Sequence, residues 1–313
     1  MNQKRKKILV AIDGSGQSLN AVRYISKIQL FQKPEVVLFH VLRKIDQAFW
    51  DMGVNPVSRG RIAEISAWEV ARKKQAQEFM NQAFDILVQS GFPRESVKVD
   101  IHKSQVGIAR DIAKESLNGY DAIAVGRKGL SKLKDMVLGS VAIKLVEKLS
   151  HAPVCVVGGN PGYGKILLSM DASEGAMKAV DYTGKMIGGS NANIMLFHAV
   201  RTLKTSPYLF PKAVDAEYEE KMVKEINTEM NKTFAVANER LVNAGLKAAN
   251  IKTKFNADVS SRAGAIIAEA AMGEFGTIVM GRRGLSKVED FFIGRVSNKV
   301  LHLAKNQAVW IVN

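Results

Sequence analysis

A glycine-rich motif in the first half of the chain has the composition of a phosphate-binding turn. Gly126 and Gly129 are followed, after nine further residues, by Gly139 and Ser140, directly before a helical stretch. Glycine lets the backbone approach an anion closely and adopt a positive φ, and the unpaired N–H groups at the start of a helix attract negative charge. The motif therefore predicts a phosphate cradle formed by the backbone near Gly139, Ser140 and Val141.

Polar side chains around this motif could complete a nucleotide site. Ser140 offers a hydroxyl donor, and Arg127, Lys128 and Lys132 are expected to supply mobile positive charge. Asp13 follows the first apolar stretch of the chain and is expected to lie across the same crevice. Its carboxylate could accept a hydrogen bond from a ribose hydroxyl or an adenine amine, or hold a metal ion through water.

The elements that must position these residues occur twice. The segment Ile8–Asp13 recurs as Ile166–Asp171, and Gly126–Lys132 recurs as Gly281–Lys287. Because a repeat of this length corresponds to a structural domain, we expect two copies of one domain. The predicted domains are residues 1–158 and 159–313.

Within the first repeat, short apolar runs alternate with helical stretches. The predicted strands are Lys7–Ile12, Glu35–Val41, Val97–Ile101, Ala122–Val125 and Val154–Val157. The predicted helices are Leu19–Leu30, Arg61–Gln89, Val106–Leu117 and Ser140–Leu149. This alternation predicts an α/β fold: two tandem doubly wound domains, each a parallel sheet with helices on both faces. Ligands of such sheets bind at the carboxyl ends of the strands, where the strand order reverses.

The aspartate after the first strand and the G-x2-G-x9-G-S motif after the fourth resemble the universal stress protein family, and the two copies resemble its tandem members. The resemblance implies five-stranded sheets in the order 3-2-1-4-5 and, as in the ATP-binding members, ATP held with Mg²⁺ or Mn²⁺ through its phosphates. It places Asp13 and Val41 near the adenine, with Gly126 and Gly129 around the ribose and phosphates. It places Gly139, Ser140 and Val141 on the phosphates. Other members of the family do not bind ATP.

The second repeat departs from the pattern at two positions. It keeps Gly281, Gly284 and Gly294, and Asp171 is the counterpart of Asp13, but Arg295 replaces the serine and Ala172 replaces the glycine after the aspartate. The arginine could occupy the phosphate position or pair with a γ-phosphate. We therefore expect the second repeat to be the weaker nucleotide site.

Composition limits the other classes of protein. The chain is 47% hydrophobic and 24% charged, as in ordinary globular proteins, which excludes a disordered or collagen-like chain. One cysteine excludes a disulfide scaffold and favours a reducing compartment, the cytoplasm. No apolar run approaches the length of a membrane span, and no signal peptide is expected. The net charge of +15 favours an anionic partner.

Further residues have structural interpretations. His40 and His198 occupy equivalent positions after the second strand of each repeat, and we expect them to be hydrogen-bonded structural residues rather than metal ligands. The fifth strands, Val154–Val157 and Val309–Val312, are expected to pair with each other as an intramolecular pseudo-dimer, and a homodimer is an open alternative. The segments 43–60 and 201–216 carry Trp50, Tyr208 and Phe210, and are either packed surface loops or a lid.

Three functions are compatible with these features. The first is a regulatory, stress-response protein that binds ATP, mainly in the first repeat, because no residue pattern supplies a positioned base for hydrolysis. The second is a slow ATPase or autokinase that uses Asp13 and a divalent ion, with Ser140 as acceptor. The third is a nucleotide-independent binder of an acidic lipid, metabolite or nucleic acid, of which nucleic acid is the least expected.

Overall fold

The computed structural model describes residues 5–28, 34–44, 59–130, 137–201, 216–284 and 293–313. In the first half the strands are β1 (Lys7–Ala11), β2 (Glu35–Leu42), β3 (Val97–Lys103), β4 (Ala122–Gly126) and β5 (Val154–Val157). The helices between them are α1 (Gly16–Lys27), α3 (Arg59–Gln89), α4 (Ile108–Glu115) and α5 (Ser140–Lys148), with a short 3₁₀ turn at Arg94–Ser96.

The second half repeats this series of elements. Its strands are β6 (Lys165–Ser169), β7 (Asn193–Ala199), β8 (Ile251–Asn256), β9 (Thr277–Gly281) and β10 (Ala308–Val312). Its helices are α6 (Glu174–Ile187), α7 (Ala216–Asn243), α8 (Arg262–Met272) and α9 (Arg295–Leu303), with a 3₁₀ turn at Ala248–Asn250. The predicted α/β architecture with two tandem units is confirmed.

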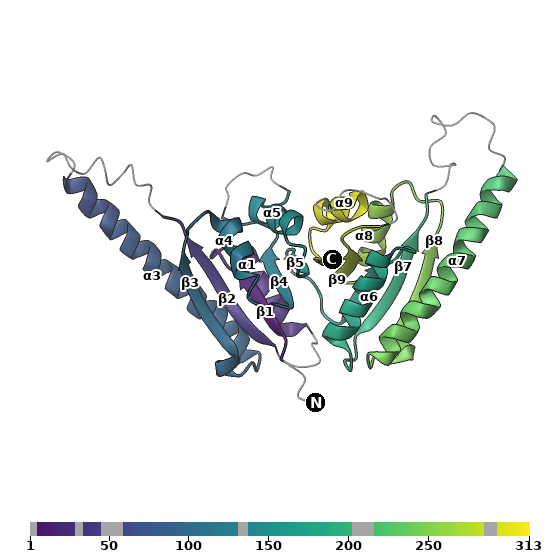
Figure 1. Cartoon of the computed structure of the whole chain (residues 1–313), viewed down its shortest axis with the longest axis horizontal. Coiled ribbons are helices and arrows are strands. Elements are labelled where there is room, and N and C mark those ends of the chain that lie inside the picture. The colour runs from purple at the N-terminus through teal and green to yellow at the C-terminus, as the bar shows by residue number, and fades with distance from the viewer. Residues whose placement is uncertain (1–4, 29–33, 45–58, 131–136, 202–215, 285–292) are drawn as a thin grey trace.

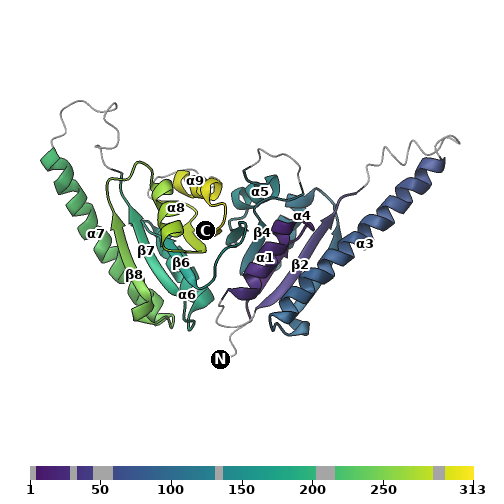
Figure 2. The same cartoon turned by 180° about the vertical axis from the view of Figure 1, so that it is seen from behind.

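All the strands belong to one sheet of ten strands, in the order β3-β2-β1-β4-β5-β10-β9-β6-β7-β8. Each half therefore has the expected order 3-2-1-4-5, and its strands pair in parallel. The order reverses between β1 and β4, so the crevice of the first half opens beyond the ends of these two strands. Figures 1 and 2 show the halves as two wings, with α3 and α7 along the outer ends.

Alternate residues of each strand face two different helical layers. In β1, Ile8 and Val10 pack in a core cluster with α1 and α3, whereas Leu9 and Ala11 belong to the cluster beneath α4 and α5. All four side chains are buried. This burial of both strand faces explains the nearly continuous apolar runs in the sequence, because a central parallel strand has no solvent-exposed side.

The two halves join at their fifth strands. β5 pairs with β10 in antiparallel register, with Val156 opposite Val309, so the expected pairing of these strands is present. On one face of the joined sheet, the Trp310 indole donates to the Tyr24 hydroxyl at 2.8 Å. The Tyr24 hydroxyl is also 2.8 Å from the hydroxyl of Thr277. An aromatic and hydroxyl network from both halves thus closes this face.

Three helices of the first repeat, α1, α3 and α4, begin at other residues than predicted, and for α1 and α4 the reason is a local side chain. Helix α1 begins at Gly16 rather than Leu19, because the Ser15 side chain caps it by accepting from the Ser18 amide at 3.1 Å. Helix α4 begins at Ile108 rather than Val106, because the Asp111 carboxylate accepts from the amides of the preceding loop. Polar side chains, rather than the apolar pattern, therefore determine where these helices begin.

Candidate functional site

The turn between β4 and α5 ends at an open helix N-terminus. Gly139 is the N-cap of α5 in an extended conformation, and among the described residues no side chain caps it. Ser140, the first residue of the helix, is exposed. No described side chain therefore occupies the first amides of α5, which are the groups that attract an anion at a helix start.

The motif glycines are required for packing rather than for left-handed backbone, which corrects the sequence interpretation. None of Gly126, Gly129 and Gly139 has a positive φ. A Cβ atom on Gly126 would lie 2.8 Å from the backbone of Gln17, at the start of α1. A Cβ atom on Gly129 would lie 2.4 Å from a carboxylate oxygen of Asp13. The glycines thus let the end of β4 and the following loop approach α1 and the end of β1.

Asp13 connects the end of β1 to the motif loop. Its Oδ1 accepts from the Ser15 amide at 3.0 Å, and its Oδ2 accepts from the Leu130 amide at 3.1 Å. The loop is fixed a second time because the Gln17 side chain accepts from the Lys128 amide at 2.7 Å. Asp13 therefore lies across the crevice as expected, and in this structure its carboxylate holds the loop in place.

The expectation that Arg127 supplies mobile charge to the crevice is wrong. Its side chain is buried, with 3% of the residue exposed, and it points into the interface between the halves. There it donates to the carbonyl oxygens of Leu301, His302 (2.6 Å) and Ala304 (2.7 Å) at the end of α9. Burial lowers the pKa of the guanidinium. Arg127 thus caps a helix of the other repeat.

The second repeat makes the equivalent contact to the first repeat. Arg282, the counterpart of Arg127, donates to the carbonyls of Glu147 and Leu149 (2.6 Å) at the end of α5, and to the Asn313 side chain at 3.1 Å. Each helix that begins at a glycine motif therefore ends against an arginine from the motif of the other half. A cation at a helix C-terminus satisfies unpaired carbonyls and the negative end of the dipole.

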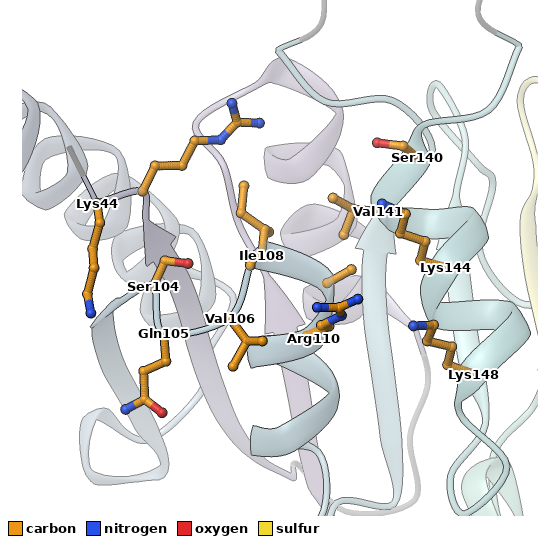
Figure 3. A pocket seen from close by; sticks show the side chains of 13 residues that line it. Lys44, Ser104, Gln105, Val106, Ile108, Arg110, Ser140, Val141, Lys144 and Lys148 are labelled. Carbon is orange, nitrogen blue, oxygen red and sulfur yellow. The ribbon is translucent and has the colours of Figure 1, made fainter. Parts of the chain in front are cut away.

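A cavity of about 580 Å³ lies beside the N-terminus of α5. Of the predicted site residues in the first repeat, Ser140 and Val141 line its described wall. Figure 3 shows the other walls, which come from the end of β2, the loop before α4 and the facing side of α5. Val41, the predicted adenine neighbour, lies near the end of β2 with its side chain buried in the core. The volume is in the range of about 300–1,000 Å³ that is usual for small-molecule sites.

The second repeat reproduces the glycine geometry. A Cβ atom on Gly284 would lie 2.5 Å from a carboxylate oxygen of Asp171, and one on Gly281 would meet the backbone of Gly175 at 2.5 Å. Gly294 is the N-cap of α9, without a side-chain cap among the described residues, and Arg295 is exposed. In both repeats the structure thus places the second motif glycine against the aspartate that follows the first strand, and Arg295 occupies the position of Ser140 in the second repeat.

The two equivalent histidines are structural, as expected. The His40 ring lies 2.7 Å from the carbonyl of Ile12, and the His198 ring lies 2.6 Å from that of Met170. Burial lowers the pKa of each imidazole, although the hydrogen bond to the carbonyl acts in the opposite direction. Each ring thus fixes the end of a second strand to the end of a first strand.

Some predicted features lie outside the described residues. They are Lys132 and the three aromatic residues of the longer segments, Trp50, Tyr208 and Phe210. Within the described residues there is no group of three histidine, cysteine or acidic side chains that could hold a metal ion. No helix among them has the length and apolarity to cross a bilayer.

The sequence analysis missed several cations that surround the cavity. Lys144 and Lys148 project from one side of α5, and Arg110 projects from α4 toward them (Figure 3). The four-residue spacing of the two lysines predicts that they share a helix face, since residues i and i+4 lie on the same side of a helix. The sequence does not predict that Arg110 lies near them, because this depends on how α4 packs against α5.

Comparisons with known proteins agree with this architecture. The model of the universal stress protein family matches residues 4–158 and 162–313. Universal stress protein YxiE of Bacillus subtilis (strain 168) is 33% identical over 152 residues, which are 48% of this chain and 97% of that protein. Universal stress protein MJ0577 of Methanocaldococcus jannaschii is 29% identical over 167 residues, 50% of this chain and 97% of that protein. Each of these relatives corresponds to one repeat.

Solved structures extend the likeness to the whole chain. The crystal structure of a universal stress protein from Archaeoglobus fulgidus DSM 4304 has a TM-score of 0.64 and 18% identity, and covers 99% of both chains. A universal stress protein solved in complex with cAMP covers 48% of this chain, with a TM-score of 0.34 and 21% identity. At 18% identity, the likeness to the Archaeoglobus fulgidus structure shows the fold alone. Because the family model matches both halves over nearly their full length, the chain belongs to the universal stress protein family, as a tandem-domain member.

Proposed function

We propose that the first repeat binds ATP and that the protein is a regulatory nucleotide-binding protein of the stress response, located in the cytoplasm. The observation that carries the proposal is the open N-terminus of α5, which begins at Gly139 beside a cavity of about 580 Å³. Free amides at a helix start favour phosphate oxygens, and the exposed Ser140 hydroxyl adds a donor. The second repeat is proposed as the weaker site.

The residues present fit a nucleotide with a divalent ion. The backbone from Gly139 to Val141 would hold phosphate oxygens, and Mg²⁺ or Mn²⁺ would be coordinated mainly by the phosphates themselves. The ion would neutralise part of the phosphate charge. Asp13, after the end of β1, is the acidic residue predicted for this site and would contact the nucleotide or a water on the ion.

The surroundings of Asp13 favour binding over catalysis. Both of its oxygens already accept a backbone N–H, from Ser15 and Leu130. These two bonds hold the carboxylate against the motif loop, whereas a general base must be positioned to reach the attacking water. We therefore expect hydrolysis to be slow, and phosphate release by the wild type and by Asp13→Ala tests this: fast turnover that the substitution abolishes would favour the ATPase alternative.

Calorimetric titration with ATP and Mg²⁺ tests the binding itself. The first variant is Ser140→Asp, which places a carboxylate where phosphates would lie and should weaken binding at least about tenfold, because like charges repel. The same substitution should leave the melting temperature unchanged or slightly higher, since an acidic residue in the first turn complements the helix dipole. Ser140→Ala is the control for loss of the hydroxyl alone. Absence of binding heat in the wild type, or equal binding in Ser140→Asp, would contradict the proposal.

A further inference from the structure

The cavity beside α5 is bounded on one side by α4 and α5, and we call the space between these two helices the groove. The wall of the cavity includes five cationic residues and no carboxylate among the described residues: Arg43 and Lys44 after β2, and Arg110, Lys144 and Lys148 on α4 and α5. Figure 3 shows Lys144 and Lys148 projecting from α5 toward Arg110 on α4. Side chains in a helix lean toward its N-terminus, so both lysines reach back in the direction of Ser140. The positive charge therefore extends beyond the helix start along the groove.

These cations have no ion-pair partner among the described residues. The described salt bridges involve other lysines and arginines, such as Lys185 with Asp121 and Arg240 with Asp181. Asp111 follows Arg110 directly in the chain, but its carboxylate is already hydrogen-bonded. It accepts from the Ser104 hydroxyl and from the amides of residues 105–107. The groove thus concentrates positive charge that the described part of the protein does not neutralise.

The pair of cations Arg110 and Lys148 is specific to the first repeat. Helices α5 and α9 have nine residues each, so Lys148 corresponds to Leu303 and Lys144 to Lys299. Helices α4 and α8 begin after the N-caps Gly107 and Ser261, so Arg110 corresponds to Gly264. The second repeat therefore lacks the counterparts of Arg110 and Lys148, and any function of this pair belongs to the first repeat.

We propose that the groove between α4 and α5 is a second anion subsite beside the proposed ATP site. This proposal rests on the proposed function and specifies the ligand of the first repeat as an adenine nucleotide with four or more phosphates. The first phosphates would contact the start of α5, and the additional phosphate would lie between Arg110 and Lys148. Several unpaired cations facing one groove suit a chain of anionic groups, because each charge-assisted hydrogen bond is stronger than a neutral one.

Calorimetry at low salt, where exposed charges are little screened, tests this subsite. The probes are ATP, adenosine 5′-tetraphosphate and inorganic tripolyphosphate, each with Mg²⁺. The variant Arg110→Gln/Lys148→Gln removes two charges from the groove. The control Lys73→Gln/Lys74→Gln removes two exposed charges from α3, in the opposite helical layer. We expect the wild type and the control to bind the tetraphosphate about tenfold more tightly than ATP, and the groove variant to lose this preference.

Other outcomes separate the subsite from the proposed function. Equal affinities for ATP and the tetraphosphate in the wild type would overturn the subsite while nucleotide binding stands. A groove variant that weakens both nucleotides by the same factor would also overturn it, because the groove would then belong to the ATP site. If only tripolyphosphate bound, and the groove variant lost this binding, the anion subsite would be supported and the proposal that its ligand is a nucleotide would be contradicted. If no probe gave binding heat with the wild type, both the subsite and the proposed ATP binding would be contradicted.

Discussion

Individual residues of the motif have different tasks, although they look alike in the sequence. Gly129 leaves room for the carboxylate of Asp13, and Gly126 allows the end of β4 to contact the backbone of α1. Arg127, between them, serves the interface with the other repeat. Gly139 and Ser140, among the described motif residues, lie at the start of α5, which has no side-chain cap. The spacing of the motif thus combines packing, positioning and binding.

At this scale we predict that Gly126→Ala destabilises the protein. The new Cβ atom would lie 2.8 Å from backbone atoms of Gln17 and Ser18, and backbone cannot rotate away as a side chain can. Overpacking of this kind costs about 1–3 kcal/mol. The matched control is Gly16→Ala, whose Cβ atom meets nothing within 4 Å. Urea denaturation measures both variants, and equal stabilities would contradict the packing interpretation.

The two structural histidines predict a loss of stability in mild acid. Burial lowers the pKa values of His40 and His198 below the unfolded value of about 6.5. As the pH falls through about 6.5, the two imidazoles become protonated in the unfolded chain but stay neutral in the folded protein. The free energy of unfolding therefore decreases. Above that value the two rings contribute no pH dependence.

Urea denaturation at pH 7.5 and pH 5.5 measures this decrease. In the variant His40→Asn/His198→Asn the difference between the two pH values should become smaller, because asparagine keeps a donor near the carbonyl and does not titrate. A variant that retains the full wild-type decrease would show that other groups cause it.

At the scale of elements, the helix starts of the first repeat contrast with each other. The loop before α4 is filled by the protein itself, because the Asp111 carboxylate accepts from the amides of residues 105–107 and from the Ser104 hydroxyl. The start of α5 has no such occupant among the described residues. Hydrogen bonds from the chain itself thus stabilise the loop before α4, whereas no described side chain caps the start of α5.

We predict that Asp111→Asn destabilises the first repeat by about 1–3 kcal/mol, since an amide cannot replace all four accepted hydrogen bonds of a buried carboxylate. Burial acts to raise the pKa of this carboxyl, but its hydrogen bonds outweigh burial and lower it, so the charged form is the stabilising one. Asp181→Asn, which removes an exposed ion pair with Arg240, is the control and should cost little. Urea denaturation at neutral pH compares them, and equal losses would contradict the interpretation.

The elements were more predictable than the contacts between them. The alternation of apolar runs and helical stretches predicted every strand of the first repeat, because each repeat buries its sheet on both faces. The position of Asp13 was predictable because it follows a strand directly. The role of Arg127 was not, since its acceptors lie 174 to 177 residues away in the chain. The groove between α4 and α5 likewise depends on packing that local sequence does not encode.

At the scale of the whole molecule, the interface connects the two candidate sites. Helix α5 begins at the motif of the first repeat and ends against Arg282, while α9 begins at the motif of the second repeat and ends against Arg127. The paired strands β5 and β10 lie between these contacts. A displacement of Arg127 or Arg282 would therefore change the contacts at the C-terminus of a helix in the other repeat.

This arrangement predicts that the repeats unfold together and that the arginines help to couple them. In Arg127→Gln/Arg282→Gln the last carbonyls of both helices lose their cationic donors, so the interface should weaken while each repeat keeps its own core. Scanning calorimetry should then show the single transition of the wild type broaden or split into two. Arg240→Gln, which removes an exposed arginine within the second repeat, should leave one transition. A double variant that melts as sharply as the wild type would show that β5, β10 and the Trp310 network couple the halves without the arginines.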